Sequence, residues 1–276
     1  MLRPAVNDDF EGALGARWTR TCPGGGTLET AESALRLVLP SAAPGRYSDA
    51  QIDDYSGLRL RRFPWRPPLR IEVRARASHP VLPVGGTATD APQRALQGTA
   101  GFGFWNYPLT AAGGIPRLPD AVWFFAASPP SNMALVPGSP GNGWKAQVVH
   151  AHRLGALAAG LPAAGAVGWA RLSGREAAAA RWIQRLTGTH EVVLGADLTE
   201  WHEYALEWRA EEARFWVNGA LVLAAPDPPR GPLGFVAWID NQYAVATPRG
   251  ALRFGTLASG REWLALDWLR ITPLES

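Results

Sequence analysis

The sequence predicts an all-β protein folded as a sandwich of two antiparallel sheets, and three observations support this. The 276 residues include 30 glycines and 24 prolines, a turn-rich composition that suits many short strands. Apolar residues make up 47% of the chain, which is enough to bury a sizeable core. Several segments alternate between apolar and polar residues, as strands do when one face is packed and the other is exposed. No charged or Ser/Gly-rich linker divides the chain, so we expect one domain over residues 1–276.

The alternation is clearest in two segments. In Leu69–Arg76, apolar residues at odd positions alternate with charged residues at even positions. In His202–Trp208, Tyr204, Leu206 and Trp208 share one face, and the glutamates lie on the other. The remaining strand-like segments are Ala34–Pro40, Gly101–Pro108, Ala121–Ser128, Lys145–His150, Glu191–Leu194, Arg214–Val217, Gly234–Ala244 and Trp263–Ile271.

One region departs from this pattern and predicts helix. In Ser173–Leu186, Ser173 and Glu176 form a capping box, and Gly188 follows as a C-terminal stop. The preceding Ala/Gly-rich stretch is interrupted by Pro162. We therefore expect a helical insertion over residues 152–187, which serves either as a lid or pocket wall or as a surface excursion.

The segment Trp201–Val222, WHEYALEWRAEEARFWVNGALV, resembles a signature hairpin of the concanavalin A-like lectin/glucanase superfamily, particularly of family 16 glycoside hydrolases. Asp9–Gly12 with Trp18 looks like the opening strand of such domains, and Leu266–Ile271 looks like their closing strand. The resemblance implies a jelly-roll of two stacked antiparallel sheets whose concave face forms a groove. It also implies a protein that acts on or binds carbohydrate.

The sequence departs from that family at the catalytic motif. Retaining members carry Glu-x-Asp-x-x-Glu on one strand, since a retaining mechanism needs two carboxyl groups about 5 Å apart. The strand in the equivalent order, DAVWFFAASPP at 120–130, has Trp123, Phe124 and Phe125 instead, and the motif occurs nowhere in the chain. The usual pair of catalytic carboxylates is therefore missing.

A candidate site lies in Gly234–Val245, GFVAWIDNQYAV. With a period of two, Trp238, Asp240 and Gln242 share the face opposite to an apolar one. An aromatic plate and bidentate polar side chains are what sugar recognition requires. We expect Trp238, Asn241 and Gln242 to bind ligand and Asp240 to be a catalytic acid or base. The alternative is that the strand ends here and that Asp240 and Asn241 only form the turn that follows it.

A second candidate site lies in Gly101–Pro108, GFGFWNYP. Trp105 and Tyr107 share one face, and we expect both to line the groove together with Trp123. Gly101 and Gly103 are expected to leave room for a ligand above the sheet. The alternative is a filled core with aromatic residues at its edge.

The histidines and the other acidic residues are weaker candidates. His150 and His152 would share one side of a strand end, and either is expected to act as a base beside Asp240. They lack an identifiable third ligand, so no metal and no cofactor is predicted. Asp49 and Asp53 would share a strand face able to bind calcium, but the flanking Ser, Gly and Tyr favour a solvated turn.

Other classes of function are disfavoured by composition. The formal net charge is +3 and no basic run is interleaved with aromatic residues, so we expect no nucleic-acid partner. The longest apolar stretch is rich in Ala and Gly and contains a proline, so no membrane span is expected. The single Cys22 excludes an internal disulfide.

Three functions remain open. The first is a carbohydrate-active enzyme with a non-standard site, the second is a lectin-like binding module without turnover, and the third is an intracellular enzyme that acts on a small metabolite. Because the first residues, MLRPAVNDDFEG, include no apolar stretch, we expect a cytoplasmic protein, or a secreted one whose leader has been removed.

Overall fold

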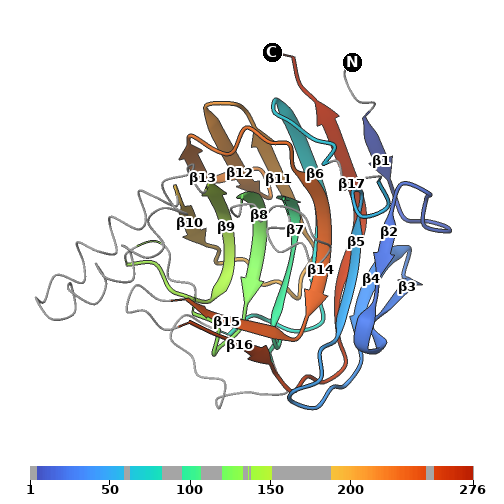
Figure 1. Ribbon diagram of the computed structural model, residues 1–276. Helices are drawn as coiled ribbons and strands as arrows, with labels where there is room; N and C mark the ends of the chain where they lie inside the picture. The colour runs from blue at the N-terminus through green and yellow to red at the C-terminus, as the bar shows by residue number, and fades with distance from the viewer. Residues whose placement is uncertain are drawn as a thin grey trace, which may run out of the picture.

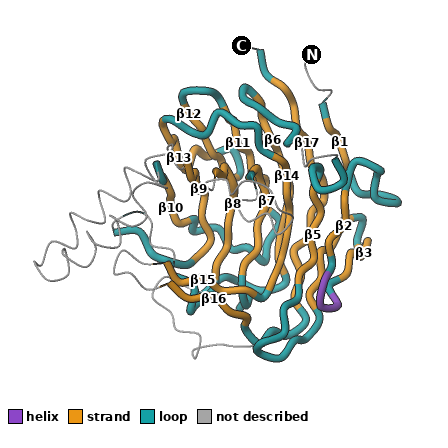
Figure 2. The backbone as a smooth tube through the Cα atoms, in the orientation of Figure 1, coloured by secondary structure: helices purple, strands orange, loops and turns teal. Residues whose placement is uncertain are grey.

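The computed structural model confirms an all-β jelly-roll made of two large antiparallel sheets (Figure 1). It describes residues 5–58, 63–82, 95–106, 120–132, 136, 138–150, 188–246 and 252–275. The expected helical insertion at 152–187 lies outside these residues, as do His152 and Tyr107. Within the described ranges, the one helical segment is the short 3-10 helix Pro23–Gly25, and strands and loops make up the rest (Figure 2).

The first sheet has eight strands within the described residues, in the order β13-β12-β11-β6-β17-β4-β3, and β1 also pairs with β17. β17 is the central long strand, and it contacts β6 on one side and β4 on the other. The strands are β1 (Val6–Asp8), β3 (Thr27–Ala31), β4 (Ala34–Leu39), β6 (Leu69–Ala77), β11 (His202–Trp208), β12 (Glu212–Val217), β13 (Ala220–Pro226) and β17 (Glu262–Pro273).

The second sheet has seven strands within the described residues, in the order β10-β9-β8-β7-β14-β5-β2. A two-stranded sheet, β15-β16, follows directly after β14 in the chain. The strands are β2 (Thr19–Thr21), β5 (Asp49–Asp53), β7 (Thr99–Trp105), β8 (Asp120–Ala127), β9 (Gly143–His150), β10 (His190–Val193), β14 (Gly234–Asp240), β15 (Gln242–Ala246) and β16 (Leu252–Thr256).

The core lies between the two sheets and is built by the predicted alternation. In β6, the odd-numbered Leu69, Ile71 and Val73 are buried, while the charged residues between them are partly exposed. The core is rich in aromatic rings, and Phe124 lies 5.0 Å from Tyr204 of the opposite sheet, centroid to centroid. Burying such large side chains provides the main favourable free energy of folding.

The segment noted for its resemblance to a signature hairpin forms two consecutive antiparallel hairpins, in which β11 pairs with β12 and β12 pairs with β13. Asn218 and Gly219 both have positive φ, 49° and 79°, as a tight two-residue hairpin turn requires. His202 has a structural role here: its Nε2 donates to the backbone oxygen of Asp197, 2.9 Å away, and its Nδ1 accepts from Asn218 Nδ2, 2.8 Å away.

Two predictions about strands are wrong. Gly234–Ala244 was expected to be one strand, but the ladder breaks at Asn241, and β14 and β15 belong to different sheets. Asp49–Asp53 was expected to be a solvated turn, but it forms the buried strand β5, paired with β14 and β2. The physical reason is that Ala50 and Ile52 point into the core, which fixes Asp49, Gln51 and Asp53 on the opposite face.

Candidate functional site

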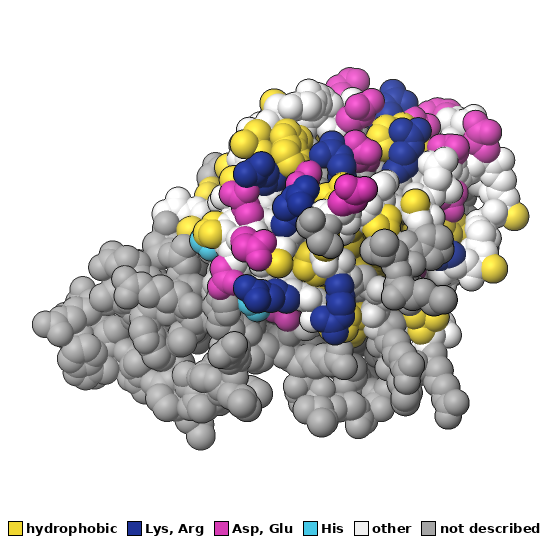
Figure 3. All heavy atoms as spheres, turned by 90° about the horizontal axis from the view of Figure 1, so that it is seen from above, with side chains coloured by type: hydrophobic (Ala, Val, Ile, Leu, Met, Phe, Trp, Pro, Cys, Tyr) yellow, Lys and Arg dark blue, Asp and Glu magenta, His cyan; other side chains and the backbone are white. Residues whose placement is uncertain are grey.

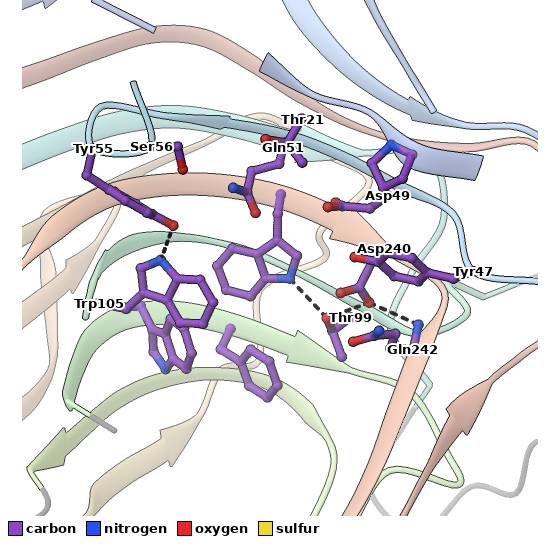
Figure 4. Close-up of a pocket in the computed structure, with 14 residues that line it drawn as sticks. Thr21, Tyr47, Asp49, Gln51, Tyr55, Ser56, Thr99, Trp105, Asp240 and Gln242 are labelled. Carbon is purple, nitrogen blue, oxygen red and sulfur yellow. Dashed lines mark hydrogen bonds between the residues drawn. The ribbon is translucent and has the colours of Figure 1, made fainter. Parts of the chain in front are cut away.

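A pocket of about 680 Å³ opens on the outward face of the seven-stranded sheet (Figure 4). We call this surface the pocket face. Strands β2, β5, β7, β8 and β14 supply most of its lining. The lining residues are Thr21, Pro23, Tyr47, Asp49, Gln51, Tyr55, Ser56, Thr99, Trp105, Trp123, Phe125, Trp238, Asp240 and Gln242. A volume of this size lies within the range of pockets that hold small organic ligands.

The floor of the pocket is aromatic. Trp123 is stacked on Phe125, with ring centroids 5.4 Å apart and an interplanar angle of 14°. Trp238 lies 5.2 Å from Trp123, and Trp105 lies 5.9 Å from Trp123, on its other side. Four rings from three neighbouring strands therefore form one continuous apolar surface, which suits the C–H face of a ring-shaped ligand.

Two glycines make this floor possible. A Cβ atom on Gly101 would lie 2.9 Å from Cη2 of Trp238, and one on Gly103 would lie 2.6 Å from Cβ of Trp123. Gly103 also has a φ of 147°, a backbone angle that residues with a Cβ atom rarely adopt. The room above Gly101 is thus taken by the Trp238 ring and by the backbone of β8, and the room above Gly103 is taken by the backbone and Cβ of Trp123, so the expectation that it is left for the ligand itself is wrong.

Hydrogen bonds hold the three indoles in place. Trp238 Nε1 donates to Thr99 Oγ1 at 2.9 Å, and Trp105 Nε1 donates to the Tyr55 hydroxyl at 2.6 Å (Figure 4). Trp123 Nε1 donates to Gln147 Oε1 at 2.8 Å. Because each ring has a fixed polar anchor, the floor is organised before a ligand arrives.

The wall of the pocket is polar and contains two carboxyl groups. Asp240 at the end of β14 and Asp49 at the start of β5 are direct cross-strand partners. Asp240 Oδ1 accepts hydrogen bonds from Thr99 Oγ1 at 2.8 Å and from the backbone N–H of Gln242 at 3.0 Å. Asp49 is 5% exposed, and its Oδ1 has no hydrogen-bond partner.

The proton affinity of both carboxyl groups is raised. Burial raises the pKa of Asp240 to about 6, although the hydrogen bonds from Thr99 and Gln242 oppose the shift. Burial, and then the negative charge of Asp240, raise the pKa of Asp49 well above its ordinary value. Like charges directly opposite each other in a sheet, both removed from water, disfavour double ionisation.

The structure brings together most of the residues predicted for this site. Trp105, Trp123, Trp238, Asp240 and Gln242 all line the one pocket. The predicted separation of faces on β14 is also observed, because Phe235, Ala237 and Ile239 lie in the core between the sheets.

Asn241 is not brought into the pocket. It is fully buried, its Oδ1 accepts from the backbone N–H of Ser48 at 3.0 Å, and its Nδ2 donates to the carbonyl oxygens of Arg46 and Leu257, both at 2.9 Å. Its amide therefore clamps the backbone at the point where β14 ends, and the ligand contact expected for it is not formed.

His150 is also placed away from Asp240, so the expected acid–base pairing is not formed. It shares strand parity with Trp144 and Val148, which point into the core, and its Nδ1 lies 3.0 Å from the carbonyl oxygen of Asp227. Asp240 aligns across β7 and β8 with Gly143, at the far end of β9. Gly143 and His150 are seven residues apart along β9, which is about 23 Å. His150 therefore lies at the other end of the sheet from Asp240.

Sequence reasoning missed the β5 side of the pocket. Asp49 and Gln51 line it, and the Tyr55 hydroxyl anchors Trp105. A signal was present, because Asp49, Gln51 and Asp53 alternate with Ala50 and Ile52 as in a half-buried strand.

The described residues contain no helix with the length and apolar character of a membrane span. They also contain no group of three or more His, Cys, Asp or Glu side chains arranged to hold a metal ion.

Comparisons with known proteins show a shared fold. No protein-family model and no curated protein sequence matches the chain. Among solved structures, a Bacillus licheniformis β-glucanase aligns with a TM-score of 0.51 at 13% identity, covering 99% of this chain and 100% of that one.

Two more similar structures come from other bacteria. The GlcNAcα1-4Gal-releasing endo-β-galactosidase of Clostridium perfringens aligns with a TM-score of 0.51 at 14% identity, over 96% of this chain, which spans 61% of that one. Rv0315 of Mycobacterium tuberculosis, described as a pseudo β-1,3-glucanase, aligns with a TM-score of 0.50 at 12% identity over 98% of both chains. At these identities, the likeness shows that the chain has the jelly-roll fold of concanavalin A-like glucanases.

Proposed function

We propose that this protein binds a carbohydrate in the pocket on the seven-stranded sheet. The observation that carries the proposal is the pairing of an aromatic floor with a polar wall. Trp123 and Trp238 offer flat apolar rings, and Asp240, Gln242 and Gln51 supply polar groups at their edge. Sugars present an apolar C–H face and a rim of hydroxyl groups, so this combination matches them better than it matches a purely apolar ligand.

The similar structures support the same class of ligand. Their names describe a β-glucanase, an endo-β-galactosidase and a transglycosylase studied in complex with NAG. One of them is named a pseudo glucanase. Carbohydrate binding, with or without turnover, is the function these proteins have in common with our proposal.

A second candidate function, hydrolysis of a glycosidic bond, is favoured by the carboxyl pair. Side chains directly opposite each other on antiparallel strands have Cβ atoms about 5 Å apart, and retaining glycosidases hold two carboxyl groups at about that separation. Asp49 and Asp240 would then replace the family motif, whose strand presents Trp123 and Phe125 to the pocket.

A glycan array, followed by calorimetry with the best oligosaccharide, tests the proposal. Trp238→Ala should weaken binding by at least about thirtyfold, because it removes a central ring of the floor. Trp216→Ala is the matched control: this tryptophan lies on the other sheet, outside the pocket, and its loss should leave affinity unchanged. If no glycan binds, or if both variants bind as the wild type does, the proposal is wrong.

A reducing-sugar assay on the same oligosaccharide separates the two candidate functions. Turnover that Asp49→Asn and Asp240→Asn each abolish would support hydrolysis. Tight binding without turnover would support a binding module.

A further inference from the structure

The charge of the pocket is one-sided. Among the described residues that line it, Asp49 and Asp240 are the two with carboxyl groups. None of these described lining residues is an arginine, lysine or histidine. Asp53, the next acidic residue on the same face of β5, adds further negative potential, since it raises the proton affinity of Asp49.

The pair is also incompletely satisfied. The Thr99 hydroxyl and the Gln242 N–H both donate to one oxygen of Asp240. Asp49 Oδ1 is buried and accepts no hydrogen bond. A buried carboxylate oxygen without a donor destabilises the protein, and at the wall of a pocket a ligand that supplies the donor relieves that cost.

The aromatic floor reaches the same place. Trp238 lies two residues before Asp240 on one face of β14, and its indole N–H is bonded to the same Thr99 hydroxyl that bonds Asp240. Figure 4 shows Asp49 and Asp240 together at one end of the pocket, beside Thr99. The face of an indole ring attracts cations, and the attraction is stronger where the contact is removed from water.

We propose, building on the function proposed above, that the pocket selects carbohydrates that carry a free ammonium group, with the ammonium between Asp49 and Asp240 and the sugar ring on Trp238. An ammonium has three N–H donors and no acceptor, so it can donate to the unpartnered Asp49 oxygen and to the Asp240 carboxylate at once. Its positive charge offsets the repulsion between the two carboxylates. A neutral hydroxyl supplies one donor and no charge.

Two other occupants would satisfy the same groups. A single proton shared by the pair would leave a site that prefers neutral sugars. A divalent cation needs more oxygen ligands than two side chains provide, and the described residues contain no third acidic or imidazole ligand grouped with this pair.

Calorimetry with three oligosaccharides of equal length separates these cases: a β-1,4-glucosamine oligomer, its N-acetylated form and the glucose oligomer, each near pH 7, in one series with EDTA and in a second with calcium. The glucosamine oligomer should bind at least tenfold more tightly than the other two. Added sodium chloride should weaken its binding and leave that of the neutral oligomers unchanged.

Asp49→Asn and Asp240→Asn should each remove the preference for the glucosamine oligomer while retaining weak binding of all three. Glu203→Gln, an exposed carboxylate on β11, is the control and should keep it. The salt dependence of the wild type tests the inference even if a variant fails to fold.

The outcomes also distinguish this inference from the proposed function. Equal or tighter binding of the neutral oligomers overturns the inference and leaves carbohydrate binding intact, as does binding of neutral oligomers that requires calcium. Binding of none of the three, together with a blank glycan array, overturns the proposed function itself.

Discussion

Tryptophan and carboxylate side chains gather on both outward faces of the sandwich, but their partners differ. On the eight-stranded sheet, arginines cover the indole rings: Arg76 Cζ lies 4.8 Å from the Trp201 centroid, and Arg270 Cζ lies 4.6 Å from that of Trp268. We call this surface the arginine face. Its other contacts of this kind are Arg36 and Arg76 with Trp263, Arg74 with Trp201, and Arg70 with Trp216.

The acids of the arginine face are paired as well. Glu32 contacts both Arg36 and Arg76, at 3.0 and 2.6 Å, and Asp267 pairs with Arg74, as expected for an acid beside arginine. Figure 3 shows basic and acidic side chains interspersed over the surface in view. On the pocket face, no cation among the described residues lies over the rings of Trp123 and Trp238, and Asp49 and Asp240 face each other.

The difference separates residues that serve folding from residues that serve a ligand. An indole under a guanidinium, or a carboxylate beside one, already has its partner within the chain. Such a side chain therefore gains little from contact with another molecule. An uncovered indole and a buried carboxylate oxygen without a donor, such as Asp49 Oδ1, leave an energetic cost that binding can relieve. The same residue types therefore have opposite meanings on the two sheets, and replacing charges one at a time tests this.

The largest expected effect is on the paired charge buried beside the pocket. Lys145, the single lysine in the chain, contacts Glu191 at 3.1 Å, with side-chain exposures of 2% and 0%. Gln147 Nε2 also donates to Glu191, at 2.7 Å. Glu191→Gln leaves the ammonium without its counter-charge and should lower the free energy of unfolding by about 3–5 kcal/mol.

Urea denaturation measures this loss, and the double variant Lys145→Met, Glu191→Gln is the control. With both charges gone, stability should return towards that of the wild type. A double variant that is less stable than Glu191→Gln alone would show that packing, and not the unpaired charge, accounts for the loss.

Asp240→Asn should have the opposite sign. The folded state raises the pKa of Asp240 to about 6, so the folded protein binds a proton more tightly than the unfolded chain does. The stability associated with this group is present at acidic pH and is lost as the pH rises through about 6. Asparagine retains an oxygen for Thr99 and Gln242, so at about pH 8 the variant should gain up to roughly 3 kcal/mol.

The gain should shrink as the pH falls from about 6 towards 4, where the wild-type carboxyl is itself neutral. Denaturant titrations across this range measure it. Asp267→Asn on the arginine face is the matched control and should lose stability, because it breaks the ion pair with Arg74. A destabilised Asp240→Asn at alkaline pH would mean that the charge already has a partner.

The sequence predicts the faces of single strands well and the meeting of different strands poorly. The alternation in β14 placed Trp238 and Asp240 on one face, and Phe235 and Ala237 on the other, as observed. This works because side chains alternate strictly along a strand. The pairing of Asp49 with Asp240 depends on the register of two strands far apart in the chain, which no local pattern encodes.

The errors have the same origin. β5 carries acids on its outward face, and the sequence pattern of such a strand resembles that of a polar turn. His150 has a suitable residue type, but its place at the opposite end of the sheet from Asp240 follows from the alignment of β7, β8, β9 and β14. Local periodicity therefore predicts which way a side chain points, and only the assembled sheet shows what it faces.

The smallest effect is expected for a paired charge on the arginine face. Glu32→Gln removes the counter-charge from Arg36 and Arg76, but the Glu32 side chain is 63% exposed, so water and salt already screen the pair. The free energy of unfolding should fall by less than about 1 kcal/mol. The loss should shrink further at about 1 M salt, where the Debye length is near 3 Å. Urea titrations at low and high salt measure it, with Glu11→Gln as an exposed control.

A loss as large as that of Glu191→Gln would mean that the arginine face contributes stability comparable to that of a buried ion pair. Its arginines and tryptophans would then act as one cooperative network, in which the guanidinium positions over several rings depend on this single carboxylate.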